Sequence, residues 1–422
     1  MPIPSKRQKR FLRILALLLS ALIFSVPNTQ AYSVLTHEEL IDLAWEDSIR
    51  PLLLAKFPGA SEAQLREAHG YAYGGSAVQD MGYYPFGKQF FSNLTHYVRS
   101  GDFVAWLLSN AHTLDEYAFA IGALSHYVGD SIGHSQAINR ATAIAFPKLE
   151  KSFGPSVTYD ESPHSHIRTE FAFDIAELSD GDFPSPDYLE YIGFQVPRKF
   201  LEEAFEKTYG FDIHEVLGRA HPALRSYRTS VRRFIPAFAE AEVVLHRHQF
   251  PPHADSEADR IFRERLARMA HQRKWKHTHK GPGIKAHLLA VLVFIVPKIG
   301  SVSDLAIKIP TPQTYEMYQS SVDHTVDIFG DMLQKLRNTG DDVKLANIDL
   351  DTGEHVKRGE YPLADATYAR LLQRLTSTPD RAIPGDVKRN IMTYYGTIAI
   401  TDKPNPKREE ELATLRMMRA TD

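Results

Sequence analysis

The stretch Ser125–Ala137 reads S-H-Y-V-G-D-S-I-G-H-S-Q-A and places His126, Asp130 and His134 at successive intervals of four residues. On an α-helix, residues at such intervals advance by only about 40° per step, so the three side chains share one stripe. Histidine and aspartate are typical Zn²⁺ ligands, and a helix fixes their separation before any metal binds. The stretch predicts a metal-binding helix. The alternative is a polar helix face with hydrogen-bonded histidines.

Helical patterns dominate the rest of the sequence. Capping-box sequences start at Thr36, opening a helix to about residue 49, and at Thr113, opening the helix that carries the histidine stripe. Apolar residues recur at helical spacing in segments 189–209, 222–246, 261–274, 314–336 and 364–375, and we expect Pro197 to break or kink the first of them. Only a hairpin at 343–355, turning at Asp351-Thr352-Gly353, fits strands. We therefore predict an all-α protein.

The first 31 residues have the pattern of a signal peptide. Five basic side chains within residues 6–13 precede an apolar run over residues 14–26, and Thr29 and Ala31 provide the small residues that a signal peptidase reads. We expect cleavage after Ala31, a mature chain that begins at Tyr32, and export to a periplasm or to the cell exterior. An uncleaved anchor is less favoured, because the apolar run is short for a membrane span.

Charge and cysteine content limit the chemistry. Without the signal peptide the chain has 44 basic and 52 acidic residues, a formal net charge of −8, so we expect no stable nucleic-acid partner. The chain contains no cysteine, which excludes disulfides and cysteine-ligated zinc. Ligands for a metal must therefore come from histidine, aspartate, glutamate and the chain terminus.

Further potential ligands precede the stripe. His37 follows Tyr32 by five residues, Asp80 lies in the loop 79–85 marked by glycine and proline, and His96 follows Asp80 by 16 residues. Each of these residues is a weak signal alone, because any histidine-rich helical protein contains similar ones. Their order along the chain is the more specific observation.

A second pair follows the stripe. His166 and Glu170 repeat the four-residue spacing of His126 and Asp130. His164 competes with His166 for a ligand position, and Asp174 competes with Glu170 because it lies on the same stripe. The spacing favours His166 together with Glu170.

The order of these pieces resembles the zinc-dependent phospholipase C family, whose fold and three-zinc site are shared by the fungal single-strand-specific zinc nucleases. The resemblance covers the chain from Tyr32 to about the 240s. It implies a phospholipase C-like domain over residues 32–248, after the signal peptide at 1–31 and before a helical C-terminal region of unknown role at 249–422. It also implies a secreted phosphodiesterase that hydrolyses a phospholipid by means of a zinc-activated water.

Carried over residue by residue, the resemblance implies about three Zn²⁺ ions per chain. The first would be held by Asp80, His96, His126 and Asp130, the second by His134, His166 and Glu170, and the third by the amine and carbonyl of Tyr32 with His37 and the other oxygen of Asp130. Asp80 is also the candidate catalytic base that takes the proton of the attacking water.

Two features depart from the family pattern. Asp130 and His134 are four residues apart, whereas the bacterial choline-phospholipid enzymes space the corresponding residues more widely. This closer spacing is more similar to the N-terminal domain of glycosylphosphatidylinositol-specific phospholipase D. Tyr32 stands where a tryptophan is usual, which matters little if the backbone provides the ligand atoms.

Two other functions compete with phospholipid hydrolysis. The same three-zinc site would serve a single-strand nuclease or nucleotidase, and a zinc-braced binding protein would use metal without catalysis. The aromatic residues Tyr83, Tyr84 and Phe86 have two interpretations: they would line a headgroup or acyl pocket, or they would pack on the core.

A basic turn at 273–280 precedes the apolar residues 288–296. This segment would either contact a membrane surface or form a solvated turn before a buried helix.

Overall fold

The computed structural model describes residues 34–180, 194–218, 220–230, 235–246, 249, 256–272, 307–340, 343–378, 380–396 and 405–421. Helices make up most of these ranges, which confirms the all-α prediction. The paired strands within them, β1 (Ile383–Pro384) and β2 (Ala420–Thr421), are parallel and only two residues long. Among the described helices, none combines the length and apolar character that a membrane span requires. The predicted signal peptide, Tyr32 and the basic turn at 273–280 lie outside the described residues.

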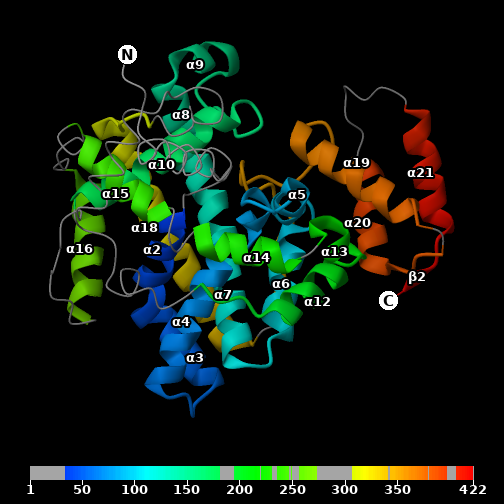
Figure 1. Ribbon diagram of the computed structural model, residues 1–422, viewed down its shortest axis with the longest axis horizontal. Helices are drawn as coiled ribbons and strands as arrows, with labels where there is room; N and C mark the ends of the chain where they lie inside the picture. The colour runs from blue at the N-terminus through cyan, green and yellow to red at the C-terminus, as the bar shows by residue number, and fades with distance from the viewer. Residues whose placement is uncertain are drawn as a thin grey trace, which may run out of the picture.

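The elements follow one another from blue to red in Figure 1. The first half comprises α2 (Val34–Ala44), the π-helical turn η1 (Trp45–Ile49), α3 (Arg50–Lys56), α4 (Glu62–Ser76), the 3₁₀ turn η2 (Gln79–Tyr83), α5 (Gln89–Tyr97), α6 (Ser100–Asn110), α7 (Leu114–Gly133), the π-helical turn η3 (His134–Ile138), α8 (Asn139–Ala145), α9 (Pro147–Phe153) and α10 (Pro163–Asp180). The second half comprises α12 (Arg198–Tyr209), α13 (His214–Leu217), α14 (Ala220–Thr229), α15 (Ile235–His246), α16 (Glu257–Gln272), α18 (Pro312–Thr339), α19 (Pro362–Thr376), α20 (Gly385–Gly396) and α21 (Pro406–Met417).

Helix α7 runs through the middle of the molecule (Figure 1). It begins at the predicted capping box, in which Thr113 accepts a hydrogen bond from the Glu116 amide and Glu116 accepts one from the Thr113 amide. Every residue from Tyr117 to Asp130 is buried, because α4, α6 and α18 pack around this helix. The histidine stripe therefore lies in the interior.

Glycines bring α4 and α7 into direct backbone contact. A Cβ atom on Gly122 would lie 2.1 Å from the carbonyl oxygen of Ala72, and one on Gly75 would lie 2.0 Å from that of Phe119. Larger residues would hold the helices apart. Because His126 follows Gly122 by one turn on α7, this close approach sets how far its ring lies from α4.

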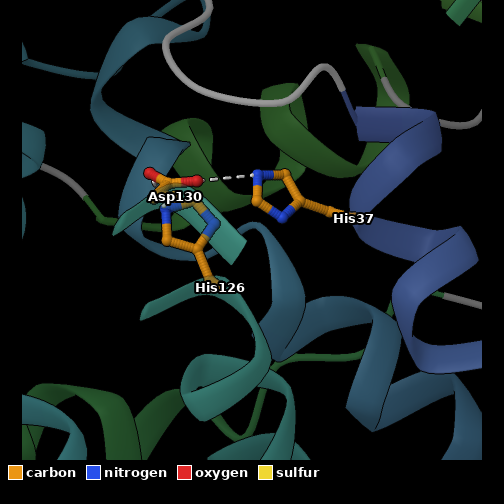
Figure 2. Close-up of side chains that lie close together, drawn as sticks. All are labelled: His37, His126 and Asp130. Atoms are coloured by element: carbon orange, nitrogen blue, oxygen red, sulfur yellow. Dashed lines mark ion pairs between the residues drawn. The ribbon is translucent and has the colours of Figure 1, made fainter. Parts of the chain in front are cut away.

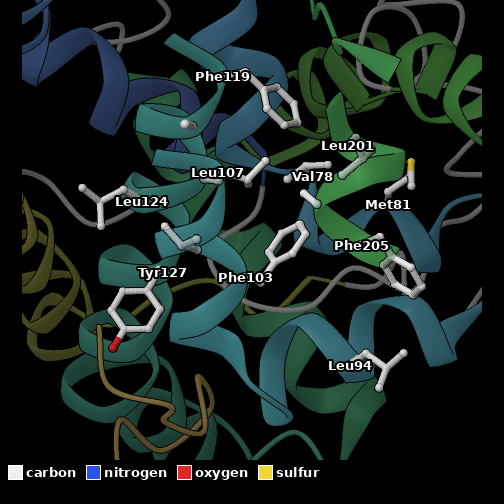
Figure 3. Packing of buried hydrophobic residues seen from close by; sticks show 14 of the residues in the cluster. Val78, Met81, Leu94, Phe103, Leu107, Phe119, Leu124, Tyr127, Leu201 and Phe205 are labelled. Atoms are coloured by element: carbon white, nitrogen blue, oxygen red, sulfur yellow. The ribbon is translucent and has the colours of Figure 1, made fainter. Parts of the chain in front are cut away.

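One hydrophobic cluster unites the beginning and the end of the described chain. Figure 3 shows part of it around α7, and other members come from α19, α20 and α21, which lie on the opposite side of the molecule from α15 and α16 (Figure 1). Members far apart in sequence include Ile41, Val78, Phe119, Leu350, Leu371 and Leu415. The predicted domain boundary between residues 248 and 249 stays a prediction.

The capping box predicted at Thr36 is wrong. Helix α2 begins at Val34, and Thr36 lies within its first turn. The carboxylate of Asp174 on α10 accepts hydrogen bonds from the amides of Leu35 and Thr36 at 3.2 and 3.3 Å, and from the Thr36 hydroxyl at 2.8 Å. A tertiary contact thus satisfies the amides that a local cap would otherwise serve.

The predicted hairpin at 343–355 forms a tight turn with little strand pairing. A single antiparallel bridge joins Ile348 and His355. Asp349 closes the turn, because its amide donates to the Glu354 carbonyl and its own carbonyl accepts from the Gly353 amide, both at 2.8 Å. Gly353 has a φ of +74°, in the left-handed region that favours glycine.

Replacing Gly122 by alanine is expected to separate α4 from α7. The added methyl group would collide with backbone atoms that cannot move aside, so the free energy of unfolding should fall by at least about 1–3 kcal/mol. Urea unfolding followed by circular dichroism measures this change. Gly59→Ala is the matched control, because nothing lies within 4 Å of its Cβ position. Equal stabilities of the two variants would contradict the close helix contact.

Candidate metal centre

The structure buries every predicted ligand that it describes. His37 comes from α2, Asp80 from η2, His96 from α5, His126 and Asp130 from α7, His134 from the start of η3, and His166 and Glu170 from α10; each is at most 1% exposed. Tyr32 lies outside the described residues, two positions before α2 begins. Elements far apart in the chain therefore converge on one interior region.

Asp130 lies at the centre of this region. Its Oδ1 atom is 3.2 Å from Nε2 of His37, and a dashed line marks this ion pair in Figure 2. Its Oδ2 atom is 3.0 Å from Nε2 of His126 and 3.3 Å from Nε2 of His96. The rings of His37 and His126 stack with centroids 4.3 Å apart. His96 Nε2 also lies 3.3 Å from Oδ1 of Asp80. Two ligand groups result, His37–His126–Asp130 and Asp80–His96–His126.

His134, His166 and Glu170 form a third ligand group. Oε1 of Glu170 lies 2.9 Å from Nε2 of His166 and 3.6 Å from Nε2 of His134, and the two rings meet edge to face with centroids 4.9 Å apart. The competing residues lie elsewhere, because His164 is exposed and Asp174 caps α2.

The helical rise explains why the stripe is divided between groups. Eight residues of α-helix span about 12 Å, or more than two turns. His126 and His134 accordingly belong to different ligand groups. The helix widens at the last residue of the stripe, because His134 begins η3, a π-helical turn of the kind often found at functional sites.

Backbone carbonyls determine which ring nitrogens face the centre. Nδ1 of His96 lies 2.7 Å from the Ser92 carbonyl oxygen, and Nδ1 of His126 lies 2.9 Å from that of Ser76. Because a carbonyl only accepts, each Nδ1 is the protonated donor and each Nε2 points to the centre. The two Nε2 atoms are 3.4 Å apart, so their lone pairs repel unless a proton or a metal ion lies beside them.

The electrostatics of the centre favour a bound cation. Burial by itself would lower the pKa of His96, but hydrogen bonds and charge interactions with Asp130 and Asp80 outweigh it and raise that pKa to about 10. Burial would raise the pKa of Asp130, yet the charge of His126 and hydrogen bonds from the surrounding histidines hold it well below its ordinary value. Burial and the neighbouring His126 lower the pKa of His37. An ionised carboxylate thus attracts positive charge to this interior.

Several polar atoms of the centre have charged groups nearby but no well-aligned hydrogen bond. Within the described part of the chain, this holds for both oxygens of Asp130 and Glu170, for Oδ1 of Asp80 and for both ring nitrogens of His166. Each buried polar atom left in this state costs about 1–3 kcal/mol. A metal ion bound among them removes that cost, and Zn²⁺ takes nitrogen and carboxylate ligands. The residues present therefore fit zinc.

Sequence reasoning missed one buried residue beside the third group. Asp351 is fully buried, and its Oδ1 atom lies 2.9 Å from Nδ1 of His134. The sequence placed Asp351 only in a predicted turn, because no helical spacing connects it with the other ligands. Burial by itself would lower the pKa of His134. Its interactions with the carboxylates of Asp351 and Glu170 outweigh burial and raise that pKa well above its ordinary value.

The three aromatic residues that follow Asp80 lie in different surroundings. The ring of Tyr83 lies edge-on to His96 with centroids 6.0 Å apart, beside the ligands. Tyr84 packs against Tyr227 in the core, with centroids 5.1 Å apart. Phe86 is 73% exposed and has a φ of +66°, which is unusual for a residue other than glycine.

Comparison with known proteins relates one part of the chain to a known family. The family model described as zinc dependent phospholipase C matches residues 36–216 of the chain. Neither a curated protein nor a solved structure matches the chain. The matched range contains the candidate ligands from His37 to Glu170, and its family supports a phospholipase C-type hydrolase that depends on zinc. Asp351 lies outside that range.

Replacing Asp130 by asparagine is expected to remove more than one zinc ion and to abolish hydrolysis, because its two oxygens face two ligand groups. Elemental analysis of the purified variant measures the metal content. Asp115→Asn is the control on the same helix, about three turns before His126, and it should retain full metal content. Equal loss from both variants would show that α7 responds to any change rather than to loss of the shared carboxylate.

Proposed function

We propose that the protein is an exported phosphodiester hydrolase that holds about three Zn²⁺ ions and cleaves a phospholipid in the manner of phospholipase C. The observation that carries this proposal is the position of Asp130, whose Oδ1 faces His37 of one ligand group while its Oδ2 faces His96 of the adjacent group. A structural zinc site is closed around one ion, whereas adjoining groups with shared ligands fit a cluster of ions. The predicted signal peptide supports export.

The residues of the centre have distinct proposed roles. The three ligand groups would hold the ions, and the amine and carbonyl of Tyr32 would complete the site at His37. Clustered zinc would neutralise the phosphodiester and provide a nucleophile at neutral pH. Asp80, 1% exposed and 3.3 Å from His96 Nε2, would accept the proton of the attacking water.

Two features favour a lipid over a nucleic acid. Phe86 presents a large apolar side chain to solvent from a backbone conformation that costs about 1–3 kcal/mol, and it lies three residues after Tyr83, beside the ligands. An exposed aromatic ring in this position suits contact with acyl chains or a membrane surface. The formal net charge of −8 after removal of the signal peptide disfavours a polyanionic substrate.

A substrate panel tests the proposal. The mature protein is assayed on phosphatidylcholine and phosphatidylinositol vesicles, on single-stranded DNA and on a chromogenic phosphodiester, with and without a chelator. We expect chelator-sensitive release of diacylglycerol, and Asp130→Asn serves as the inactive control. Phosphatidic acid would instead indicate D-type cleavage, preferential cleavage of DNA would indicate a nuclease, and bound zinc with no hydrolysis at all would indicate a zinc-braced binding protein.

The N-terminus provides a separate prediction. An amide nitrogen is a poor zinc ligand, so Tyr32 would chelate metal only after cleavage behind Ala31 frees its amine. The contacts of Asp174 with Leu35 and Thr36 anchor the start of α2 next to His37. A protein that carries Met-Gly before Tyr32 should therefore bind less zinc and hydrolyse more slowly, while its fold survives. Proteolytic trimming to Tyr32 should restore both properties; full zinc content and activity without trimming would reject this ligand.

A further inference from the structure

A segment of the C-terminal part of the chain reaches into the metal centre. Residues 343–356 lie in the connection between α18 and α19. The Ser100 hydroxyl donates to the Ile348 carbonyl at 2.6 Å, and the Leu350 amide donates to the His96 carbonyl at 3.2 Å. The segment is thus bonded directly to the backbone of a candidate ligand.

The turn in this segment places Asp351 in the interior. Oδ1 of Asp349 accepts hydrogen bonds from the amides of Asp351 and Thr352 at 2.8 and 3.2 Å. A Cβ atom on Gly353 would lie 2.9 Å from the Ser131 carbonyl oxygen on α7, so the turn sits directly on the helix that carries the stripe. Glycine is required here both by this contact and by the positive φ.

The carboxylate of Asp351 is held from several sides. Its Oδ1 atom lies 2.9 Å from Nδ1 of His134, and its Oδ2 atom accepts hydrogen bonds from the hydroxyls of Tyr97, at 3.1 Å, and Tyr361. The side-chain amide of Asn139 donates to the Asp351 carbonyl at 2.8 Å. With 0% exposure, Asp351 has no direct access to bulk solvent. Tyr97 on α5 and Tyr361, the residue before α19, thus hold the charged side chain against one histidine ring, while Asn139 on α8 holds its backbone.

We propose that Asp351 is the positioning residue of the third ligand group, in that it holds His134 at Nδ1 so that Nε2 faces Glu170 and His166. Two other candidate ligands, His96 and His126, have the same arrangement, with an oxygen at Nδ1 and Nε2 toward the centre. At His134 that oxygen belongs to a carboxylate supplied from outside the family-matched range. The proposal rests on the zinc site of the proposed function.

A carboxylate at this position does more than orient the ring. A metal-bound histidine is a stronger ligand when its other nitrogen donates to a carboxylate, and loss of such a partner typically weakens metal binding by about 10–100-fold. The third group contains only one carboxylate of its own, Glu170. Asp351 therefore adds negative charge next to the metal position without occupying a ligand position.

Zinc affinity tests the proposal. Competition with a chromogenic chelator gives the affinity of each zinc for the wild type and for Asp351→Asn, with circular dichroism to check the fold. We expect one zinc to bind about 10–100-fold more weakly while the others are retained. The control is Glu354→Gln, an exposed acidic residue of the same turn, which should bind zinc like the wild type. Unchanged affinities in a folded Asp351→Asn protein would overturn the proposal.

A double-mutant cycle separates positioning from a general structural role. If Asp351 acts through His134, adding Asp351→Asn to His134→Asn should weaken zinc binding no further. A further loss of similar size in that background would overturn the proposal. Should Asp351→Asn fail to fold, Tyr361→Phe removes one bond to the carboxylate and should weaken the same zinc by a smaller factor; no change would count against the proposal. Because these measurements follow zinc and not turnover, zinc binding without lipid hydrolysis would defeat only the proposed function.

Discussion

The buried carboxylate of Asp130 is the constraint on which the rest of this structure depends. An ionised group in a protein interior is stable only when its charge is matched closely, because the desolvation penalty is several kcal/mol. Here the match comes from His37 on α2, His96 on α5 and His126 on α7, each with Nε2 within 3.3 Å of a carboxylate oxygen. Each of these helices must therefore reach the same point, and their packing follows from that requirement.

The scaffold meets this requirement through close backbone contact rather than large side chains. Gly75 and Gly122 let α4 and α7 touch, which places the Ser76 carbonyl where it binds Nδ1 of His126. A side chain at either glycine would move that carbonyl away from the ring. Rigid elements hold ligand geometry better than loops do, so the same contact that stabilises the helix pair also preserves the orientation of a ligand.

Local geometry explains which parts of the centre could be predicted from sequence. The four-residue spacings of His126 with Asp130 and of His166 with Glu170 are properties of one helix, so sequence alone reveals them. Asp80 and His96 lie on η2 and α5, separate elements whose position relative to α7 no local pattern encodes, and only the order of a known family suggested them. The prediction of a capping box at Thr36 was wrong, and Asp351 was missed, for the same reason. A partner distant in sequence determines the role of each residue: Asp174 bonds to Thr36, and His134 contacts Asp351. No local sequence pattern encodes such a partner.

The position of Asp351 changes how the C-terminal part of the chain is understood. Leu350 and Leu371 belong to the same hydrophobic cluster as residues of α4 and α7, and the turn at 349–353 bonds to the ligand helices. Metal that binds only the folded state stabilises every element whose order the site requires. Since the ring of His134 contacts Asp351 on one nitrogen and faces Glu170 with the other, metal binding and docking of the C-terminal turn should favour each other. The helices beyond residue 248 would then belong to the centre as much as those before it.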